Sequence, residues 1–531
     1  MAAAPLILIL FCITLTTCEE CYVTPSCSLD QENCFTLADF DVISMYNMTL
    51  IFLQGNHSLD TELLVINSPK FAMLSADTDT WINCDRTGFF NFINASFVEI
   101  SNLRFYGCGH TTLQEMTFVN IQNLMFIGKD DSGTALVIMN SIANVTNCAF
   151  VLNTGTVWFP VDELVLRGSD YRRVGGAIAA RQATVRITDC RFHGNNAEIG
   201  GVLYVEETTV YMSNSHFQNN FAKPQASHNG RIYETGGVLV FFLDCLVTVN
   251  NSTFHNNSGM MAHQGVFLVM IGTIMLNKCT FLDTEGSVIV AFASNVTDTN
   301  STYRQNNSTD GAVLFAGRSR VMYFGCNFTD NSAFLRGGVV QADNSVLVFK
   351  GCHFSSNEAI FGGGVAVTEF CTLICEESTF SNHYAVMGGA LHVGDSRIWL
   401  INIIMYNNSA QQRGSAMYLD GVFVNFISLT IKSHPATTLN KGVLYATSCS
   451  INSSQQFVVS ENSDMDASIF YLDRCVCNFT GNFTFSGNLG SLVAINSQMI
   501  FRGITKFFNC QIMKFTKILC HENLELPYQC Q

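Results

Sequence analysis

Three pairs of adjacent acidic residues are the groups in this chain best suited to acid–base chemistry. They are Asp130-Asp131, Glu206-Glu207 and Glu376-Glu377. Hydrolysis of a glycosidic bond needs two carboxyl groups that converge on the substrate. The first pair lies in a Gly-Lys-Asp-Asp-Ser-Gly turn, and the other two are expected between strands, where an acidic side chain is ordinarily solvated. The sequence therefore predicts no catalytic residue, with a polysaccharide-active enzyme as the alternative.

Histidines and cysteines are the next candidates, because both bind metal ions. Four histidines stand beside a recurring Phe: His193, His216, His255 and His353. Two follow the Phe and two precede it, so no two in the same position belong to neighbouring repeats, and we expect polar surface histidines rather than a metal or pH-sensing strip. Cys371-x3-Cys375 and Cys475-x-Cys477 lack a matching second pair with histidines at zinc-finger spacing. We predict no metal site and no cofactor.

The 21 cysteines suit an oxidising compartment. Some lie near the two ends, and others recur two residues before a Phe: Cys148, Cys190, Cys279, Cys326 and Cys352. Cysteines stacked on neighbouring repeats are close enough for a disulfide, but they can equally remain buried thiols. Both possibilities stay open.

Asparagine-linked glycosylation is the modification that the sequence predicts most strongly. The chain contains sixteen Asn-x-Ser/Thr sequons, where composition alone gives roughly eight. The predicted glycosylated residues include Asn47, Asn56, Asn94, Asn144, Asn295, Asn327, Asn407 and Asn478. An apolar stretch within residues 1–18 resembles a secretory signal peptide. We therefore expect a protein that is secreted or lies on the extracellular face of the cell surface.

The bulk properties exclude several partners. The net charge is −15 with only 27 Lys and Arg, which argues against nucleic acid and anionic membranes. No run of 18 apolar residues follows the signal segment, so no membrane span is predicted, and Gly265 to Leu276 is interpreted as two buried strands. Charged residues make up 13% of the chain and Phe numbers 43, a composition that favours a core of stacked aromatics.

A repeat of about 25 residues organises these groups and is clearest from 174 to 509. Each unit has a glycine step, a short apolar run, an alternating run that ends in Phe, and then Asn. The second glycines of the step include Gly176, Gly201, Gly237, Gly338, Gly364 and Gly389. The phenylalanines include Phe192, Phe217, Phe254, Phe328, Phe354 and Phe380. The asparagines include Asn195, Asn220, Asn257, Asn331 and Asn357.

The repeat predicts an all-β, right-handed parallel β-helix with disulfide-containing caps. A fixed period of 20 to 50 residues is typical of a solenoid, and within a unit the apolar period is two rather than 3.6. Helical repeats need longer units, and the ladder of leucine-rich repeats is missing. Stacked coils would place the Phe residues in one internal column. The asparagines would lie at turns that tolerate left-handed backbone, with amides bonded from coil to coil, and the glycines would allow positive φ or close approach.

The Gly-Gly-Ala-Ile segment at 175–178 and the Phe-x-x-Asn segments resemble the repeats of chlamydial polymorphic outer-membrane proteins, over Phe150 to Phe508. The resemblance implies a β-helical surface or adhesive protein of the pectin-lyase-like architecture. Most Gly-Gly pairs here precede Val rather than Ala, and no autotransporter barrel follows, so this chain departs from outer-membrane secretion by that route.

We predict a signal peptide at 1–18, an N-terminal cap with the first coils at 19–80, β-helix repeats at 81–509, and a Cys-containing cap or truncated module at 510–531. The function that fits best is a non-catalytic structural, adhesive or ligand-recognition role with extracellular protein or glycan ligands. The Phe221 to Thr235 insertion is the candidate grafted loop. A fragment of a larger receptor is a third possibility, and nothing in the sequence indicates the oligomeric state.

Overall fold

The computed structural model describes residues 20–26, 35–37, 40, 42–44, 47–84, 89–129, 133–155, 157–160, 171–222, 238–259, 265–435, 442–502, 505–508, 518–520 and 524–525. All regular elements named in this part of the chain are β-strands. The chain divides into two compact units, Met1–Thr253 and Phe254–Gln531. Each unit is described by itself.

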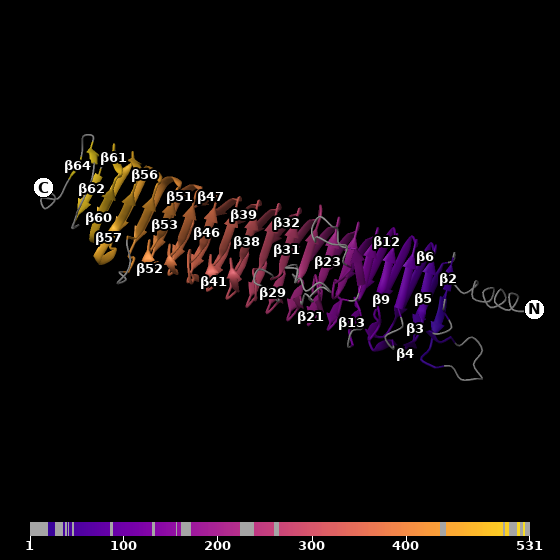
Figure 1. Ribbon diagram of the computed structural model, residues 1–531. Helices are drawn as coiled ribbons and strands as arrows, with labels where there is room; N and C mark the ends of the chain where they lie inside the picture. Colours follow the sequence, from indigo (N-terminus) through magenta and orange to yellow (C-terminus); the bar gives the residue numbers. More distant parts are fainter. Residues whose placement is uncertain are drawn as a thin grey trace, which may run out of the picture. The chain divides into compact units, whose positions relative to one another are not determined.

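A coil of unit 1 contains four short strands, which we call its first, second, third and fourth strands. One coil consists of β19 (Ile178–Arg181), β20 (Thr184–Thr188), β21 (Arg191–His193) and β22 (Asn196–Ala197). The next coil repeats the order with β23 (Leu203–Glu206), β24 (Thr209–Ser213), β25 (His216–Gln218) and β26 (Phe221–Ala222). Each strand pairs in parallel with its counterpart one coil along, as in Val185 with Val210 and Phe192 with Phe217 (Figure 1).

The other strands of unit 1 extend the same columns. The first strands are β2 (Val42–Ser44), β5 (Glu62–Ile66), β8 (Phe89–Ile93), β11 (Thr111–Gln114), β14 (Leu136–Met139) and β27 (Leu239–Phe242). The second strands are β1 (Glu20–Val23), β3 (Met48–Phe52), β6 (Lys70–Ser75), β9 (Phe97–Ser101), β12 (Phe118–Gln122), β15 (Ile142–Thr146) and β28 (Leu246–Asn250). The third strands are β4 (Gly55–Leu59), β7 (Thr80–Cys84), β10 (Arg104–Tyr106), β13 (Met125–Ile127) and β16 (Ala149–Val151). One antiparallel pair, β17 (Val157–Pro160) with β18 (Tyr171–Val174), is added to these columns.

Unit 2 repeats this architecture. Its first strands are β31 (Phe267–Met270), β34 (Ile289–Phe292), β38 (Leu314–Gly317), β42 (Val340–Asp343), β46 (Ala366–Glu369), β50 (Leu391–Gly394), β53 (Met417–Asp420), β55 (Leu444–Thr447), β57 (Ser463–Asp473) and β60 (Leu489–Ile495). Its second strands include β32 (Thr273–Asn277), β35 (Asn295–Thr299), β39 (Arg320–Phe324), β43 (Val346–Lys350), β47 (Thr372–Glu376), β58 (Val476–Phe479), β61 (Gln498–Phe501) and β63 (Ile518–Cys520). Its third strands include β33 (Thr280–Leu282), β36 (Thr302–Arg304), β40 (Asn327–Thr329), β44 (His353–Ser355), β48 (Thr379–Ser381), β59 (Asn482–Ser486), β62 (Thr505–Phe508) and β64 (Leu524–Glu525).

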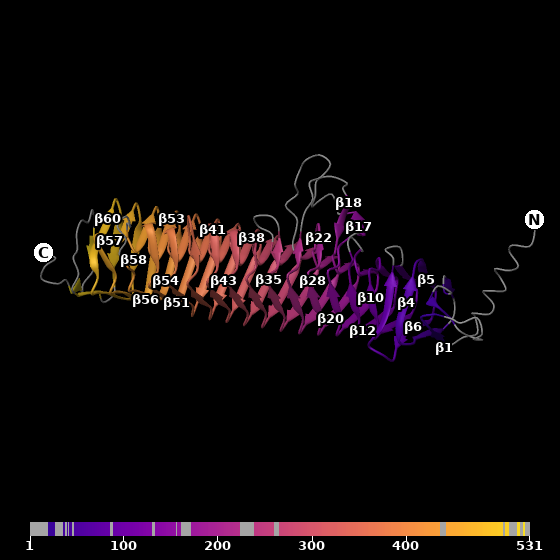
Figure 2. The same cartoon turned by 90° about the horizontal axis from the view of Figure 1, so that it is seen from below.

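In three coils of unit 2 the second and third strands merge into one long strand: β51 (Arg397–Tyr406), β54 (Phe423–Lys432) and β56 (Ser450–Ser460). These strands lie side by side (Figure 2). The fourth strands are β30 (Ser258–Gly259), β37 (Asn307–Asp310), β41 (Ser332–Arg336), β45 (Glu358–Ala359), β49 (Tyr384–Met387) and β52 (Ser409–Arg413). The predicted parallel β-helix is therefore confirmed, and Gly265 to Leu276 indeed contains two strands, β31 and β32.

The predicted aromatic column lies inside each unit. In unit 1, Phe192 and Phe217 stack with ring centroids 4.7 Å apart and ring planes within 6°. In unit 2, Phe328, Phe354 and Phe380 stack at 4.7 Å per step. The column of unit 2 also includes Tyr303, which the Phe pattern did not predict. Rings that repeat at the coil spacing exclude water from the core, which makes each coil depend on its neighbours.

The recurring asparagines form a buried ladder, but they do not have the left-handed backbone that we predicted for them. The left-handed residue is the one before the ladder position, such as Asp330 and Ser356, with φ of 55° and 53°. The side chain of Asn331 donates to the side-chain oxygen of Asn357 at 3.0 Å and to the carbonyl of Tyr303 at 3.0 Å. The predicted bonding from coil to coil is therefore correct. The prediction of φ failed because a buried amide needs these partners, whereas the exposed residue before it makes the turn.

The two positions of each glycine step require glycine for different reasons. Gly337 has a φ of 65°, which favours glycine because it has no Cβ. Gly338 has no positive φ, but a Cβ there would lie 2.2 Å from the carbonyl oxygen of Gly364 on the next coil. Close approach of backbones therefore explains the second glycine. Gly237 lies outside the described residues.

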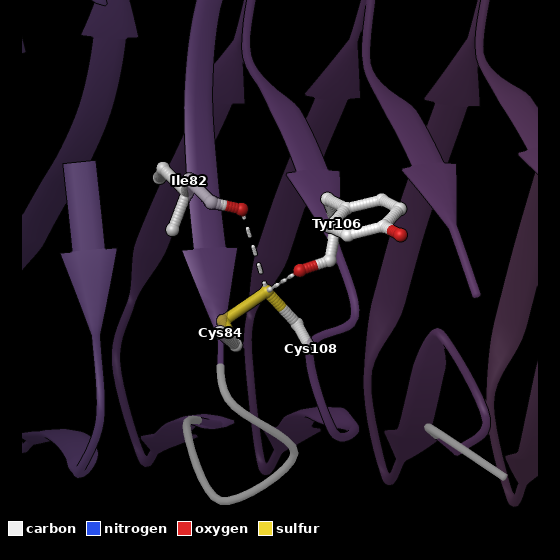
Figure 3. The surroundings of a disulfide bond; sticks show 4 residues. All are labelled: Ile82, Cys84, Tyr106 and Cys108. Atoms are coloured by element: carbon white, nitrogen blue, oxygen red, sulfur yellow. Dashed lines mark hydrogen bonds between the residues drawn. A yellow bond between two sulfur atoms is a disulfide. The ribbon is translucent and has the colours of Figure 1, made fainter. Parts of the chain in front are cut away.

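The cysteines show both of the predicted outcomes. Cys84 and Cys108 form a disulfide between neighbouring coils, with Cα atoms 4.6 Å apart (Figure 3). Cys21 is also disulfide-bonded. The cysteines that precede the Phe positions, among them Cys326 and Cys352, are buried free thiols.

Predictions for the ends of the chain fall largely outside the described residues. Residues 1–18 are not described, and within 510–531 only β63 and β64 are. These two strands pair in parallel with β61 and β62, so one further coil is present there. At the other end, β1 already pairs with β3.

Candidate functional site

The first strands of unit 2 carry a ladder of stacked tyrosines on their outer side. Alternate residues of a strand point to opposite faces, so Met417 and Leu419 of β53 are buried in the core while Tyr418 faces outward. The parallel register places Tyr418, Tyr445 and Tyr471 on consecutive coils. Their ring centroids are 5.3 Å and 4.7 Å apart, with ring planes within 5° and 1°. We call these three residues the tyrosine ladder.

Charged and aromatic groups extend the tyrosine ladder at one end. His392 precedes Tyr418 in the same register, with ring centroids 4.6 Å apart. The guanidinium of Arg413, from the fourth strand β52, lies 5.1 Å from the centre of the Tyr445 ring. A cation over an aromatic face is attracted by the ring quadrupole. The result is a strip of aromatic rings next to a fixed positive charge.

A pocket of about 420 Å³ lies at the His392 end of the ladder. Leu335 and Arg336 come from β41, Phe361 and Gly362 follow β45, Glu369 ends β46, Met387 ends β49 and His392 lies in β50. The pocket therefore lies between the outer side of the first strands and the edge formed by the fourth strands. Residues of four consecutive coils line it.

His392 is the polar centre of this pocket. Its Nδ1 is buried and has no hydrogen-bond partner in the described structure. Burial and, to a smaller extent, the positive charge of Arg336 lower the pKa of His392 to about 4 against the opposing effect of Asp420, so the ring is neutral near pH 7. A Cβ at Gly362 would lie 2.4 Å from Nδ1. Glycine at this position therefore leaves room for the imidazole ring in the wall of the pocket.

Acidic residues flank the pocket at the ends of the first strands. Asp343 and Glu369 stand in register on neighbouring coils, and Asp420 occupies the same position two coils beyond Glu369. Glu369 lies 3.9 Å from Arg336, and both side chains are more than half exposed. A solvated pair of this kind contributes little to stability, so these charges remain available for contacts with a ligand.

Exposed apolar side chains lie beside the pocket. Phe334 of β41 and Ile360 directly follow a pair of residues that stand in register, Ala333 and Ala359, so they belong to neighbouring coils. Phe361 is 52% exposed. Large apolar side chains that gather on a surface indicate an interaction site more often than isolated ones do. The pocket, the tyrosine ladder and these apolar residues together form the candidate site.

None of the predicted repeat residues lines this site, because the recurring Phe and Asn side chains point into the coils. His193, His216, His255 and His353 are exposed, as predicted. Glu206 was expected to be solvated, but it ends β23, is only 2% exposed and lies 3.6 Å from Arg181. Glu376 pairs with Lys350 at 3.0 Å. Asp130 and Asp131 lie outside the described residues.

The structure describes only the first two residues of the predicted inserted loop. Phe221 and Ala222 are not loop residues but form β26, which pairs with Asn196 and Ala197. Residues 223–235 lie outside the described part of the chain. The start of the loop was therefore predicted two residues too early. The fourth strand that begins at Phe221, directly after the ladder residue Asn220, is short and has no strong apolar pattern.

The tyrosine ladder was not predicted from the sequence, although a pattern was present. Met-Tyr-Leu-Asp, Leu-Tyr-Ala-Thr and Phe-Tyr-Leu-Asp recur at 417–420, 444–447 and 470–473. The tyrosine is the one outward residue between two inward ones. Across the described residues, no group of three or more His, Cys, Asp or Glu side chains is arranged to hold a metal ion. The described chain also contains no helix long and apolar enough to cross a membrane.

Comparison with known proteins supports the resemblance noted from the repeats. The chain is 22% identical over 209 residues to the probable outer membrane protein pmp19 of Chlamydia pneumoniae, covering 38% of this chain and 22% of that protein. The chain therefore spans about a fifth of the length of this curated relative. No protein-family model matches the chain.

Two solved structures are similar in outline. A PL6 alginate lyase in complex with a trisaccharide is 10% identical, with a TM-score of 0.26, over 77% of this chain and 86% of that one. PfbA, a surface adhesin of Streptococcus pneumoniae, is 10% identical, with a TM-score of 0.22, over 82% and 84%. At these scores neither likeness carries an argument about activity.

Proposed function

We propose that this chain is a surface β-helix protein that recognises an extracellular ligand, without catalysis, through the tyrosine ladder and the adjoining pocket. The observation that carries the proposal is the stack of Tyr418, Tyr445 and Tyr471 on the outer side of three consecutive coils. The rings lie on the side of the strands opposite the core. Tyr418 and Tyr471 are half-buried there, and Tyr445 between them is 7% exposed. Tyrosine provides a large contact area at low entropic cost, and tyrosine and arginine are enriched among the residues that dominate binding energy at interfaces.

The partial likeness to a chlamydial outer membrane protein supports a location at the cell surface. The sequons and the apolar N-terminal segment support the same location. The proposed ligands are extracellular glycans or proteins, since the site combines flat aromatic rings with Arg336, Glu369 and a neutral imidazole.

The test is a binding screen of the purified chain against an array of glycans and a panel of extracellular proteins. A ligand of the tyrosine ladder should bind Tyr445→Ala at least about tenfold more weakly, which corresponds to about 1.4 kcal/mol. Tyr211→Ala is the matched control, because Tyr211 also has a guanidinium over its ring, 5.4 Å away, but lies on a second strand of unit 1. Equal effects of both variants would refute the proposed site.

One observation favours a polysaccharide-active enzyme as the second candidate. Asp343 and Glu369 are carboxylates in register on adjacent coils, and neighbouring strands lie about 4.8 Å apart, close to the separation of about 5 Å in retaining glycosidases. Incubation with a set of polysaccharides, followed by assay of new reducing ends, tests this candidate. Product that disappears in Glu369→Gln would establish catalysis and overturn the non-catalytic proposal.

A further inference from the structure

The sixteen sequons are distributed unevenly over the coils. Their asparagines are Asn47, Asn56, Asn94, Asn144, Asn250, Asn251, Asn256, Asn295, Asn300, Asn306, Asn307, Asn327, Asn407, Asn452, Asn478 and Asn482. None of them lies on a first strand among the strands that the structure describes. They lie instead on second, third and fourth strands and in the turns that flank them.

In unit 2 seven sequon asparagines are exposed: Asn256, Asn295, Asn300, Asn307, Asn327, Asn407 and Asn482. Asn295 begins the second strand β35, Asn327 begins the third strand β40, and Asn307 begins the fourth strand β37. Asn300 and Asn407 occupy exposed turns with φ of 58° and 52°. A side chain at such a position points away from the core and has room for a glycan.

One sequon asparagine of unit 2 is fully buried. Asn306 is 0% exposed, and its side-chain nitrogen donates to the side-chain oxygen of Asn331 at 2.9 Å and to the carbonyl of Phe281 at 3.3 Å. A glycan on that nitrogen would replace one of its two N–H donors and could not fit inside the coil. Asn307 overlaps this sequon and is exposed. The two adjacent asparagines therefore differ completely in their capacity for modification.

We infer that N-linked glycans occupy the seven exposed asparagines of unit 2, that Asn306 is excluded, and that the outer side of the first strands stays free of glycan. The inference rests on the extracellular location given under the proposed function. In the modification, the amide nitrogen of Asn forms a bond to the anomeric carbon of a sugar carried by a lipid diphosphate. The bond from that carbon to the diphosphate breaks, and the amide proton leaves with the lipid diphosphate.

The glycan-free surface contains the first-strand part of the candidate site. The tyrosine ladder, His392 and Glu369 all lie on first strands. Glycans cover protein surface and hinder the approach of large partners. A protein that is glycosylated around its other strands thus keeps one accessible strip, and that strip holds the stacked tyrosines.

Transfer takes place while the chain enters the secretory compartment, before the ladder has formed. A glycan on Asn306 would then prevent Asn306 from bonding to Asn331, and such chains would fail to fold and to leave the cell. Chains recovered from the medium should therefore carry the modification on Asn307 and an unmodified Asn306.

The experiment is to express the full chain in cultured animal cells, purify it from the medium, and release the glycans with a glycosidase in ¹⁸O-labelled water. Mass spectrometry of the peptides then locates each labelled asparagine. We expect label at Asn256, Asn295, Asn300, Asn307, Asn327, Asn407 and Asn482, and none at Asn306. Asn307→Gln keeps the Asn306 sequon, and its secreted form should lose one glycan without gaining one at Asn306.

Label at Asn306 in secreted protein, or unmodified asparagine at most of the exposed positions, would overturn the inference. Failure of the chain to leave the cell would count against the proposed location rather than against the assignment of glycosylated and unmodified asparagines. Fusion to an unrelated secretory signal peptide then provides secreted chain for the same measurement, so the two failures are distinguished.

Discussion

The backbone N–H of Asn357 donates a hydrogen bond of 3.0 Å to Nδ1 of His383 on the next coil. At the equivalent step, the N–H of Asn331 donates to the side-chain oxygen of Asn357 at 2.9 Å. Histidine therefore replaces asparagine in the buried ladder, and His434 does so again two coils later, where it accepts from the side chain of Asn408. Either imidazole offers one acceptor nitrogen, which is what the ladder requires.

These two histidines should make unit 2 sensitive to acid. Burial lowers the pKa of His383 to about 3 and that of His434 to about 4. The stability that the neutral rings confer is fully present above the unfolded pKa of about 6.5 and is lost as pH falls toward the folded values. We expect each histidine to lower the free energy of unfolding by about 2.5 kcal/mol between pH 7.5 and pH 4.5.

Denaturant unfolding of the chain and of His383→Asn at the two pH values measures this loss. The variant should lose less stability on acidification, while His193→Asn, at an exposed position, should behave as the parent chain does. An identical loss in parent and His383→Asn would contradict the assignment.

Asp298 should have the opposite dependence on pH. It is fully buried, accepts hydrogen bonds from Ser301 and Tyr303, and burial raises its pKa to about 6. Because the folded state disfavours the charged form, the stability associated with this carboxyl is greatest below the unfolded pKa of about 3.8 and declines as pH rises to 6.

The Asp298→Asn variant removes that charge and keeps an oxygen acceptor. Relative to the variant, the parent chain should lose about 3 kcal/mol of unfolding free energy between pH 3.5 and pH 7.5. Unfolding curves at several pH values report the difference. If the difference in unfolding free energy between parent and variant does not change with pH, the pKa of Asp298 is not raised in the folded state.

The second glycine of the step should tolerate no side chain. In Gly338→Ala the added Cβ would lie 2.2 Å and 2.4 Å from the carbonyl oxygens of Gly364 and Glu358. Since both are backbone atoms of the next coil, we expect a loss of about 3 kcal/mol. Gly394→Ala is the matched control, because its Cβ would meet only Glu369, at 3.9 Å, and thermal denaturation of the two variants compares them. Equal stability would refute this account of the repeat.

A glycan introduced beside the pocket should block ligand binding. Gly394→Asn creates an Asn-x-Ser sequon with Asp395 and Ser396 on first strand β50. When the variant is secreted from animal cells, binding of a ligand found in the screen should fall at least about tenfold. Gly394→Gln cannot be glycosylated and should bind as the parent does. Unchanged binding by the glycosylated variant would place the ligand elsewhere.

The repeat made the inside of the coils predictable and left the outside largely unpredicted. Phe192, Phe217 and Phe354 recur because identical positions stack in the core, so their spacing alone predicts the column. The Phe pattern did not predict Tyr303. Its buried hydroxyl is tolerated because it donates a hydrogen bond to Asp298. Similarly, His383 and His434 replace asparagine because the ladder selects for an acceptor and not for one residue type.

The candidate site was harder to predict for a related physical reason. Outward positions are free of the packing constraint, so Gln341, His392 and Tyr418 differ although they share one column. The pocket also combines residues from four coils, with Arg336 and His392 more than 50 residues apart. Only the coil register shows that they meet.

The parallel pairing of counterpart strands also determines how unit 2 responds to mechanical force. Hydrogen bonds between coils point along the stacking direction, so a pull on the chain end peels one coil at a time instead of shearing a whole sheet. Neighbouring ladder residues Asn331 and Asn357 are 26 positions apart, so each detached coil lengthens the chain by roughly 85–90 Å. Under tension this unit would extend in nearly equal steps, and a surface protein built in this way yields gradually instead of rupturing at once.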